Sequence, residues 1–180
     1  MLKTLLLIVA AAAVATIAAL LAYAAFKPDT FRLSRSTTIN APPDKVFALI
    51  NDLRQFNTWN PFAKLDPQNA ITYDAVTAGV GGAYSWQGDK SGAGRMQITD
   101  SVPAQRVTAK LDFSKPFEAH NVVDFTVQAQ GDKACTVSWT MQGPMPYLNR
   151  LVTTFFDMDK TVGKDFEAGL ANLKALAEKP

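Results

Sequence analysis

Apolar residues recur at steps of three and four along the final segment of the chain, from about Pro146 to Glu178. This spacing places them on one face of an α-helix and predicts one long amphipathic C-terminal helix. Such a helix is not stable alone in water, because its apolar face must be covered. We expect this face to pack against a sheet formed by the preceding segments. The residues on the face are Leu148, Val152, Phe155, Val162, Phe166, Leu170 and Leu173.

Between Ile71 and Met141 the apolar period becomes two. Short alternating runs are separated by turn sequences rich in Gly, Pro and Asp, which is typical of antiparallel strands with one apolar face. The runs lie at residues 71–73, 84–86, 96–98, 107–113, 123–127 and 135–141. They predict a meander of about six strands.

Two further elements precede the meander. Phe31–Ile39 alternates and predicts a first strand, and Pro42-Pro43 followed by an apolar run predicts a short helix. Residues 54–62 contain three aromatic rings and Pro61, so we expect a compact irregular turn there. Helices segregated on one face of an antiparallel sheet define the α+β class. We therefore predict a curved antiparallel sheet of six to seven strands around a long C-terminal helix.

The N-terminal segment is apolar from Thr4 to Phe26 and is bracketed by Lys3 and Lys27. At about 1.5 Å per residue, this helix is long enough to cross a hydrocarbon core of about 30 Å. A cleaved secretory signal is the alternative, since small residues near Ala24 fit a cleavage site. The segment is longer than a usual signal core, which favours an uncleaved anchor. The expected division is an anchor at residues 1–27 and one domain at residues 28–180.

The side of the membrane that the domain faces is not fixed by the sequence. Lys27, Arg32 and Arg35 follow the apolar segment, whereas Lys3 precedes it. Counting Lys and Arg, the positive-inside rule leans toward a cytoplasmic domain, and an export signal would place it outside. We expect a single-pass protein of the cell membrane with its orientation undetermined.

Composition narrows the possible partners. The formal net charge is +2, without a Lys/Arg cluster, so nucleic acid is not an expected partner. The single cysteine and single histidine cannot form a usual metal cluster, and we expect neither a metal nor a cofactor. The loop at residues 88–94 is rich in glycine, but it lacks the Gly-Lys-Ser/Thr ending of a phosphate-binding loop. A hairpin turn is the better interpretation.

The order of elements and four short sequences resemble the START-like helix-grip superfamily, in particular its polyketide cyclase/dehydrase (SRPBCC) branch. The four sequences are Ala41–Phe47 (APPDKVF), Trp59–Phe62 (WNPF), Gly92–Ile98 (GAGRMQI) and Phe166–Lys174 (FEAGLANLK). The resemblance covers about residues 31–178. It implies a sheet wrapped around the last helix, with a cavity between them for a hydrophobic molecule. It does not fix the activity, since some members are enzymes.

Asp159 interrupts the apolar face of the C-terminal helix. If that face meets the sheet, the carboxylate points into the cavity, where it would accept a hydrogen bond from a ligand or act as an acid or base. The alternative is a wetted position at the cavity mouth, or a pair with a basic residue such as Arg95. Asp159 is thus the weak catalytic candidate.

Large aromatic and sulfur-containing side chains form the other candidate set. Some must pack the core, and if the resemblance holds, others line a pocket. The predicted ligand-binding residues are Tyr84, Trp86, Trp139, Met141, Phe155 and Asp159. His120 falls on the polar side of its strand and is expected to face solvent. Cys135 is expected to be a small core or cavity residue and not a nucleophile.

These observations favour a membrane-anchored domain that binds a hydrophobic small molecule or lipid. The first alternative is a cyclase or dehydratase that uses Asp159, although no second catalytic group stands at a convincing position. The second alternative is a protein-interaction or stress-response module, which would have a filled interior and an exposed apolar patch.

Overall fold

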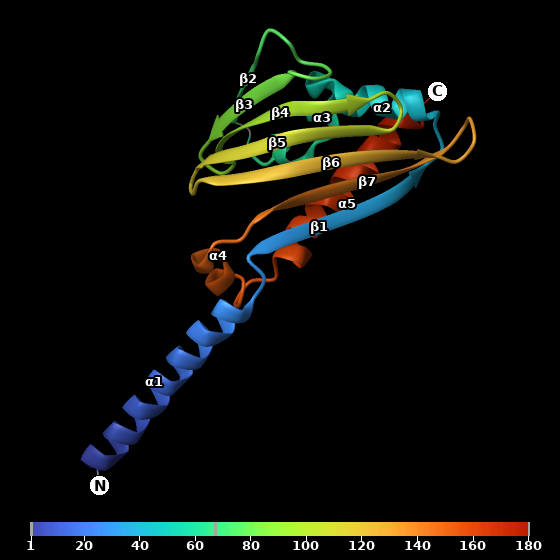
Figure 1. Ribbon diagram of the computed structural model, residues 1–180. Coiled ribbons are helices and arrows are strands. Elements are labelled where there is room, and N and C mark those ends of the chain that lie inside the picture. Colours follow the sequence, from blue (N-terminus) through green and yellow to red (C-terminus); the bar gives the residue numbers. More distant parts are fainter. Residues whose placement is uncertain (1, 67, 180) are drawn as a thin grey trace. The chain divides into compact units, whose positions relative to one another are not determined.

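The computed structural model of the protein describes residues 2–66 and 68–179. The chain divides into two units, one formed by residues 2–31 and 144–158 and the other by residues 32–143 and 159–179. The second unit contains nearly all of the sheet and most of the helices that cover it (Figure 1).

Seven antiparallel strands form one sheet in the order β1-β7-β6-β5-β4-β3-β2. The strands are β1 (Thr30–Ile39), β2 (Ala70–Tyr73), β3 (Ala83–Gly88), β4 (Gly92–Val102), β5 (Arg106–Lys115), β6 (Ala119–Ala129) and β7 (Cys135–Pro144). Strands β2 to β7 follow one another as a meander, whereas β1 joins the edge beside β7. The predicted α+β sheet of six to seven strands is confirmed.

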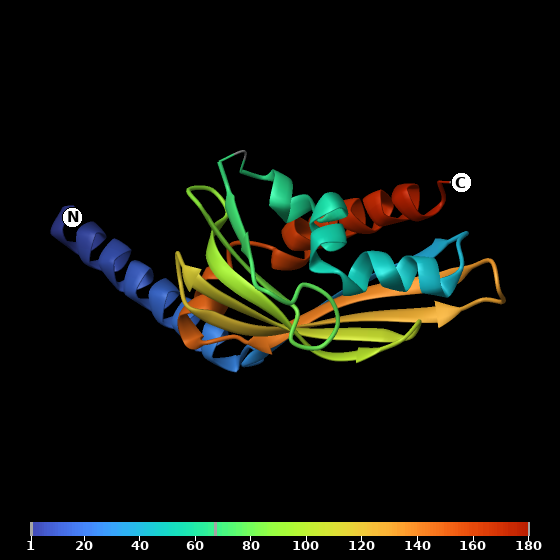
Figure 2. The ribbon, with the colours of Figure 1, turned by 90° about the horizontal axis from the view of Figure 1, so that it is seen from above.

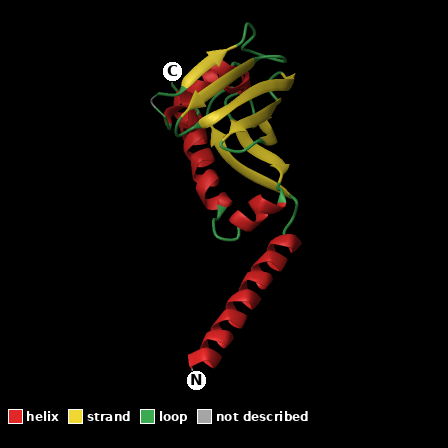
Figure 3. Ribbon diagram, turned by 90° about the vertical axis from the view of Figure 1, so that its left-hand side faces the viewer, coloured by secondary structure: helices red, strands yellow, loops and turns green. Residues whose placement is uncertain are grey.

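The helices are α1 (Leu2–Phe26), α2 (Pro43–Asn51), α3 (Leu53–Trp59), the 3₁₀ helix η1 (Pro61–Lys64), α4 (Tyr147–Val152) and α5 (Met158–Ala177). The sheet curves, and α2, α3 and α5 lie on its concave face (Figures 2 and 3). The core lies between these layers, where Phe166, Leu170 and Leu173 of α5 are almost fully buried. The expectation that the C-terminal apolar face packs on the sheet therefore holds for its second half.

The predicted single C-terminal helix is wrong in one respect: it is divided into α4 and α5. The break at residues 153–157 contains two threonines and two phenylalanines, which lose side-chain freedom in a helix. The hydroxyls of Thr153 and Thr154 both donate to the carbonyl of Arg150, at 3.0 Å each. These local bonds compete with continuation of the helix.

The predicted irregular turn at residues 54–62 is also wrong, because its first part is helix α3. The Asp52 side chain accepts a hydrogen bond from the Arg54 amide and caps the N-terminus of α3. Pro61 ends this helix without preventing it, and Asn60 caps η1 by accepting from the Phe62 amide. The two short helices bring Phe56 and Phe62 to the concave face.

Candidate ligand-binding cavity

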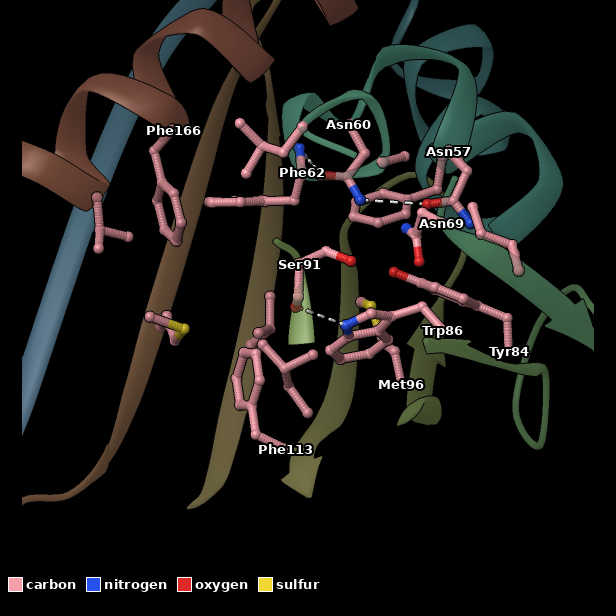
Figure 4. Close-up of a pocket in the computed structure, with 18 of the residues that line it drawn as sticks. Asn57, Asn60, Phe62, Asn69, Tyr84, Trp86, Ser91, Met96, Phe113 and Phe166 are labelled. Atoms are coloured by element: carbon pink, nitrogen blue, oxygen red, sulfur yellow. Dashed lines mark hydrogen bonds between the residues drawn. The ribbon is translucent and has the colours of Figure 1, made fainter. Parts of the chain in front are cut away.

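A cavity of about 260 Å³ lies between the concave face of the sheet and the helices α3, η1 and α5. Its wall is mainly apolar and includes seven aromatic side chains (Figure 4). The lining residues are Phe56, Asn57, Asn60, Phe62, Ala63, Leu65, Asn69, Ile71, Tyr84, Trp86, Lys90, Ser91, Met96, Leu111, Phe113, Val123, Trp139, Met141, Val162 and Phe166. An apolar wall with a few polar groups is typical of small-molecule sites.

Two aromatic contacts hold opposite parts of this wall. Trp139 of β7 stacks on Phe166 of α5 with ring centroids 4.1 Å apart. Trp86 of β3 meets Phe113 of β5 edge to face at 5.4 Å. Gly94, paired with Trp86 across β3 and β4, lies at a register shift in β4. A Cβ at Gly94 would stand 2.5 Å from the Trp86 ring, so only glycine leaves room for the ring in this position.

A chain of amides closes the side of the cavity under α3. Asn60 is buried and donates through Nδ2 to Oδ1 of Asn57 at 3.1 Å. Asn57 in turn donates to the Tyr73 hydroxyl at 3.1 Å. Asn60 Oδ1 also accepts from the Phe62 amide, so these linked side-chain amides fix the backbone between α3 and η1. Their role is structural.

Asp66 holds the hairpin turn between β3 and β4 at the cavity. Its side chain is buried and accepts from the backbone amides of Gln68 at 3.0 Å and Lys90 at 2.9 Å. These hydrogen bonds, first that of Lys90, lower the pKa of Asp66. The same turn is bound from the sheet, since Trp86 Nε1 donates to the Ser91 carbonyl at 3.1 Å. Ser91 is therefore fixed at the cavity wall.

Three residues of the wall each carry a buried polar atom that has no hydrogen-bond partner among the described residues: Asn69 Oδ1, Ser91 Oγ and Trp139 Nε1. The other two tryptophans differ, because Trp59 Nε1 donates to the Leu49 carbonyl and Trp86 Nε1 to the Ser91 carbonyl. Buried polar atoms are nearly always paired in native proteins. Figure 4 shows Asn69, Ser91 and Tyr84 turned toward one another, away from Phe166.

Few groups in the wall can carry a proton. Among the described residues of the lining, only Tyr84 and Lys90 carry an ionisable side chain, and no carboxylate is present. Burial, and then the nearby Tyr73, raise the pKa of Tyr84, which keeps this phenol neutral and able to donate a hydrogen bond. In the part of the chain that the structure describes, no group of three or more His, Cys, Asp or Glu side chains could hold a metal. The arrangement is suited to binding.

Four of the six predicted ligand-binding residues line this cavity: Tyr84, Trp86, Trp139 and Met141. Phe155 is not part of the lining. It lies in the break between α4 and α5 and is 66% exposed. The predicted helical spacing fails there because residues 153–157 leave the helix.

Asp159 does not point into the cavity. Its side chain is 66% exposed and binds Arg35, with the closest ion-pair atoms 2.9 Å apart. Arg35 of β1 also binds Glu167 at 2.7 Å, and the two carboxylates raise the pKa of Arg35. The anticipated partner Arg95 is bound to Asp74 instead, at 2.7 Å.

His120 and Cys135 lie outside the cavity wall. His120 is exposed, and its hydrogen bond to Asp112 at 2.7 Å raises its pKa. Cys135 is a buried core residue, and burial raises the pKa of its thiol. Among the lining residues that were not predicted, Phe113 shares the apolar alternation of its strand and could have been found. Asn69 and Ser91 lie in turns, where no periodic pattern marks them.

Comparison with solved structures shows the same fold in proteins of low sequence identity. Protein CV1439 from Chromobacterium violaceum aligns with a TM-score of 0.59 and 20% identity, over 86% of this chain and 100% of its own. Protein jhp0584 from Helicobacter pylori aligns with a TM-score of 0.62 and 8% identity, over 82% and 88%. DynU16, from the dynemicin biosynthetic locus, aligns with a TM-score of 0.56 and 12% identity, over 85% of this chain and 48% of its own.

No curated protein matches the sequence. The family model described as "Polyketide cyclase / dehydrase and lipid transport" matches residues 30–178, from the first strand to the end of the last helix. This match covers most of the chain, agrees with the START-like resemblance of the sequence, and supports a hydrophobic ligand-binding or cyclase-like fold. The chain belongs to the polyketide cyclase/dehydrase and lipid transport family.

Proposed function

We propose that this protein binds a hydrophobic small molecule or lipid in the cavity between the sheet and α5, while its N-terminal helix anchors it in a membrane. The observation that carries the binding function is the cavity of about 260 Å³ with seven aromatic residues in its wall. Pockets that hold small ligands have about 300–1,000 Å³, so this cavity suits a compact ligand. A pure protein-interaction module is expected to have a filled interior, whereas this wall encloses a cavity.

The anchoring part of the proposal rests on α1. Leu2–Phe26 has 25 residues and is long and apolar enough to cross a membrane. A signal sequence satisfies the same criteria. An anchor at residues 1–27 would hold the binding domain of residues 28–180 close to the bilayer, where apolar ligands concentrate.

The cyclase or dehydratase alternative has weaker support. The fold occurs in DynU16 of a biosynthetic locus, and the family description includes cyclases. Among the described residues of the lining there is no histidine or carboxylate, so a proton-transfer step in this cavity would use Tyr84 or Lys90. Asp159, the earlier acid/base candidate, is on the surface.

The binding function is tested by blocking the cavity. Full-length protein and the variant Val162→Trp would be assembled in lipid nanodiscs, and small molecules retained by each would be extracted and identified by mass spectrometry. Val162 lines the cavity, so the larger side chain should displace the ligand. Val122→Trp adds the same bulk on the half-exposed outer face of β6 and serves as control. Identical extracts from all three proteins would contradict the proposal.

A further inference from the structure

The buried polar atoms that have no hydrogen-bond partner among the described residues constrain the chemistry of the ligand more than the apolar wall does. We propose that the ligand is an uncharged, compact ring compound with an oxygen acceptor at one end and a hydroxyl at the other. The acceptor accepts a hydrogen bond from Trp139 Nε1–H, and the hydroxyl forms hydrogen bonds with Ser91 Oγ and Asn69 Oδ1. This inference rests on the proposed binding function and specifies the class of molecule.

The two polar ends come from different parts of the fold. Trp139 belongs to β7, whereas Ser91 follows β3 and Asn69 precedes β2. Three strands, β6, β5 and β4, separate β7 from β3 in the sheet. A ligand that satisfies both ends must therefore extend across the cavity. An indole N–H can only donate, so the group at the β7 end must be an acceptor.

The middle of the wall determines which ligand shape and which ligand charge the cavity accepts. Phe113, Phe166 and Trp86 present ring edges and faces to the cavity, which favours a flat ring system between them (Figure 4). A cavity of about 150 Å³ holds one benzene ring. The present volume of about 260 Å³ accepts one or two fused rings, and not a lipid with two acyl chains. Lys90 is the only charged side chain among the described lining residues and is exposed, so a buried ligand charge would stay uncompensated.

Naphthalene and four relatives test this chemistry on the full-length protein in nanodiscs: 2-naphthol, 2-acetylnaphthalene, 6-acetyl-2-naphthol and 6-hydroxy-2-naphthoate. Binding is followed by fluorescence after subtraction of empty discs. Each satisfied polar end should tighten binding about two- to tenfold, so 6-acetyl-2-naphthol should bind best. The naphthoate should bind less tightly than 6-acetyl-2-naphthol, because its charge loses hydration.

Variants assign each end. Trp139→Phe should abolish the advantage given by the acetyl group, and Ser91→Ala should reduce the advantage given by the hydroxyl. Trp59→Phe is the matched control, because Trp59 donates to Leu49 and does not line the cavity. Thermal unfolding of each variant verifies that it is folded.

The outcomes separate the two proposals. Equal affinities for all neutral probes, or tightest binding of the naphthoate, would overturn the ligand class and leave a simple apolar site. Absence of binding for every probe, naphthalene included, would overturn the proposed binding function as well.

A second inference follows independently from the unit formed by residues 2–31 and 144–158. The end of α1 is bound to α4 there. The Tyr147 hydroxyl donates to the Leu21 carbonyl at 3.0 Å, and Arg150 donates to the carbonyls of Ala25 and Lys27 at 3.2 and 3.0 Å. Ala24 is completely buried in this contact and Leu20 is half-buried, whereas the other residues of α1 are exposed.

The same unit exposes a group of large apolar side chains next to these contacts. They are Tyr147 (40% exposed), Leu148 (62%), Val152 (49%), Phe155 (66%) and Phe156 (69%). We refer to them as the α4 patch. The 25 residues of α1 span about 37 Å, which exceeds a hydrocarbon core of about 30 Å, so one or two turns at its ends lie in the headgroup region.

We infer that the α4 patch inserts into the membrane interface at the C-terminal end of α1. Because Tyr147 and Arg150 are hydrogen-bonded to the C-terminal end of α1, α4 lies at the depth of the membrane interface. Aromatic rings flanked by cations are typical of that region. Lys27 lies over the Tyr23 ring at 5.3 Å, and Arg150 over the Tyr147 ring at 5.7 Å, which supplies this combination. The inference requires the anchor but not the ligand.

Depth-dependent quenching tests this contact. An environment-sensitive fluorophore is attached to Phe156→Cys, Val14→Cys or Asp132→Cys in the full-length chain, in nanodiscs with lipids that carry a nitroxide at carbon 5 or carbon 12. The native Cys135 is completely buried and should not react. We expect shallow quenching at position 156, deep quenching at position 14 and none at position 132.

Position 132 lies in the exposed turn between β6 and β7 and serves as the aqueous control. Quenching at position 14 without quenching at position 156 would overturn the interfacial contact and leave the anchor intact. The absence of quenching at both positions would overturn the anchor too.

Discussion

Asp66 is the residue on which the geometry of the cavity wall depends most directly. It is a buried carboxylate that is stabilised by backbone amides, chiefly those of Lys90 and Gln68, and no cation among the described residues forms an ion pair with it. Backbone donors can hold a carboxylate ionised because they complete its hydrogen bonding after the loss of water. Through Lys90, Asp66 fixes the turn that carries Ser91. No sequence pattern predicted this role, because the bond joins two turns 24 positions apart.

The first prediction concerns Asp66→Asn. The amide replaces one acceptor oxygen with a donor that faces backbone donors, so we expect a lower melting temperature at pH 7. The native pKa of Asp66 is lowered, so its contribution is complete above the unfolded pKa of about 3.9 and is lost as the pH falls through the native pKa. The stability difference between wild type and variant should therefore shrink below about pH 4.

Guanidinium unfolding of the full chain in nonionic detergent, followed by tryptophan fluorescence at pH 7, 4 and 3, measures this difference. Asp132→Asn, at an exposed turn, controls for the loss of one negative charge. A difference that stays constant between pH 7 and pH 3 would show that the ionised carboxylate is not the stabilising group.

The second prediction concerns Asp159→Asn. The Asp159 carboxylate is two-thirds exposed and belongs to a surface ion pair with Arg35, and such pairs contribute little. We expect a minor loss of thermal stability and unchanged affinity for 6-acetyl-2-naphthol. Ligand titration in nanodiscs checks this, with Val162→Trp as the variant that should lose binding. A large loss of affinity in Asp159→Asn would show that Asp159 takes part in ligand binding.

At the scale of elements, alternation and helical spacing were sufficient for most of the fold. The strands from β3 to β7 and the body of α5 were predicted because each buries one regular face. The errors lie where side chains bind the local backbone: Thr153 and Thr154 end α4, and Asp52 starts α3. The loss of helical phase at residues 153–157 explains why Phe155 and Asp159 were placed in the cavity.

The third prediction concerns the contact between α5 and the sheet. A Cβ at Gly169 would stand 2.7 Å from the Trp139 ring and 2.9 Å from Pro61. Alanine favours a helix over glycine by about 1 kcal/mol, but overpacking against a rigid core ring costs about 1–3 kcal/mol. We expect Gly169→Ala to lower the free energy of unfolding by up to about 2 kcal/mol.

Gly163→Ala is the matched control on the same helix. A Cβ there meets the guanidinium of Arg35, which is the flexible end of a side chain and can move. Denaturant unfolding of both variants compares them directly. A gain in stability for Gly169→Ala equal to that of Gly163→Ala would show that α5 is not in close contact with Trp139.

At the scale of the whole molecule, the sequence was sufficient for the family and for the existence of a cavity, but not for its complete wall. Tyr84, Trp86, Trp139 and Met141 were predicted because large side chains on the inner face of a curved sheet must either pack or line a space. The polar residues were not found, because Asn69 and Ser91 depend on how two distant turns close over the sheet. Only the folded chain shows that their oxygens lack hydrogen-bond partners among the described residues.

The last prediction concerns the fate of α1 in the cell. A signal peptidase would have to cut within the segment that α4 contacts. In this segment Tyr147 and Arg150 donate hydrogen bonds to the carbonyls of Leu21, Ala25 and Lys27. Cleavage near Ala24 would remove Leu21 and Ala24, expose the α4 patch further and leave Tyr147 without its partner. An anchor that is retained keeps these contacts, and the apolar side chains of α4 remain beside lipid.

We therefore expect the chain isolated from membranes to have the intact mass of 19.5 kDa and to resist extraction by alkaline carbonate. Intact-protein mass spectrometry of the membrane and soluble fractions decides the matter. A shortened chain in the soluble fraction would contradict the anchor and the interfacial role of α4. It would leave ligand binding untouched, because the described residues that line the cavity all belong to the segment from Phe56 to Phe166.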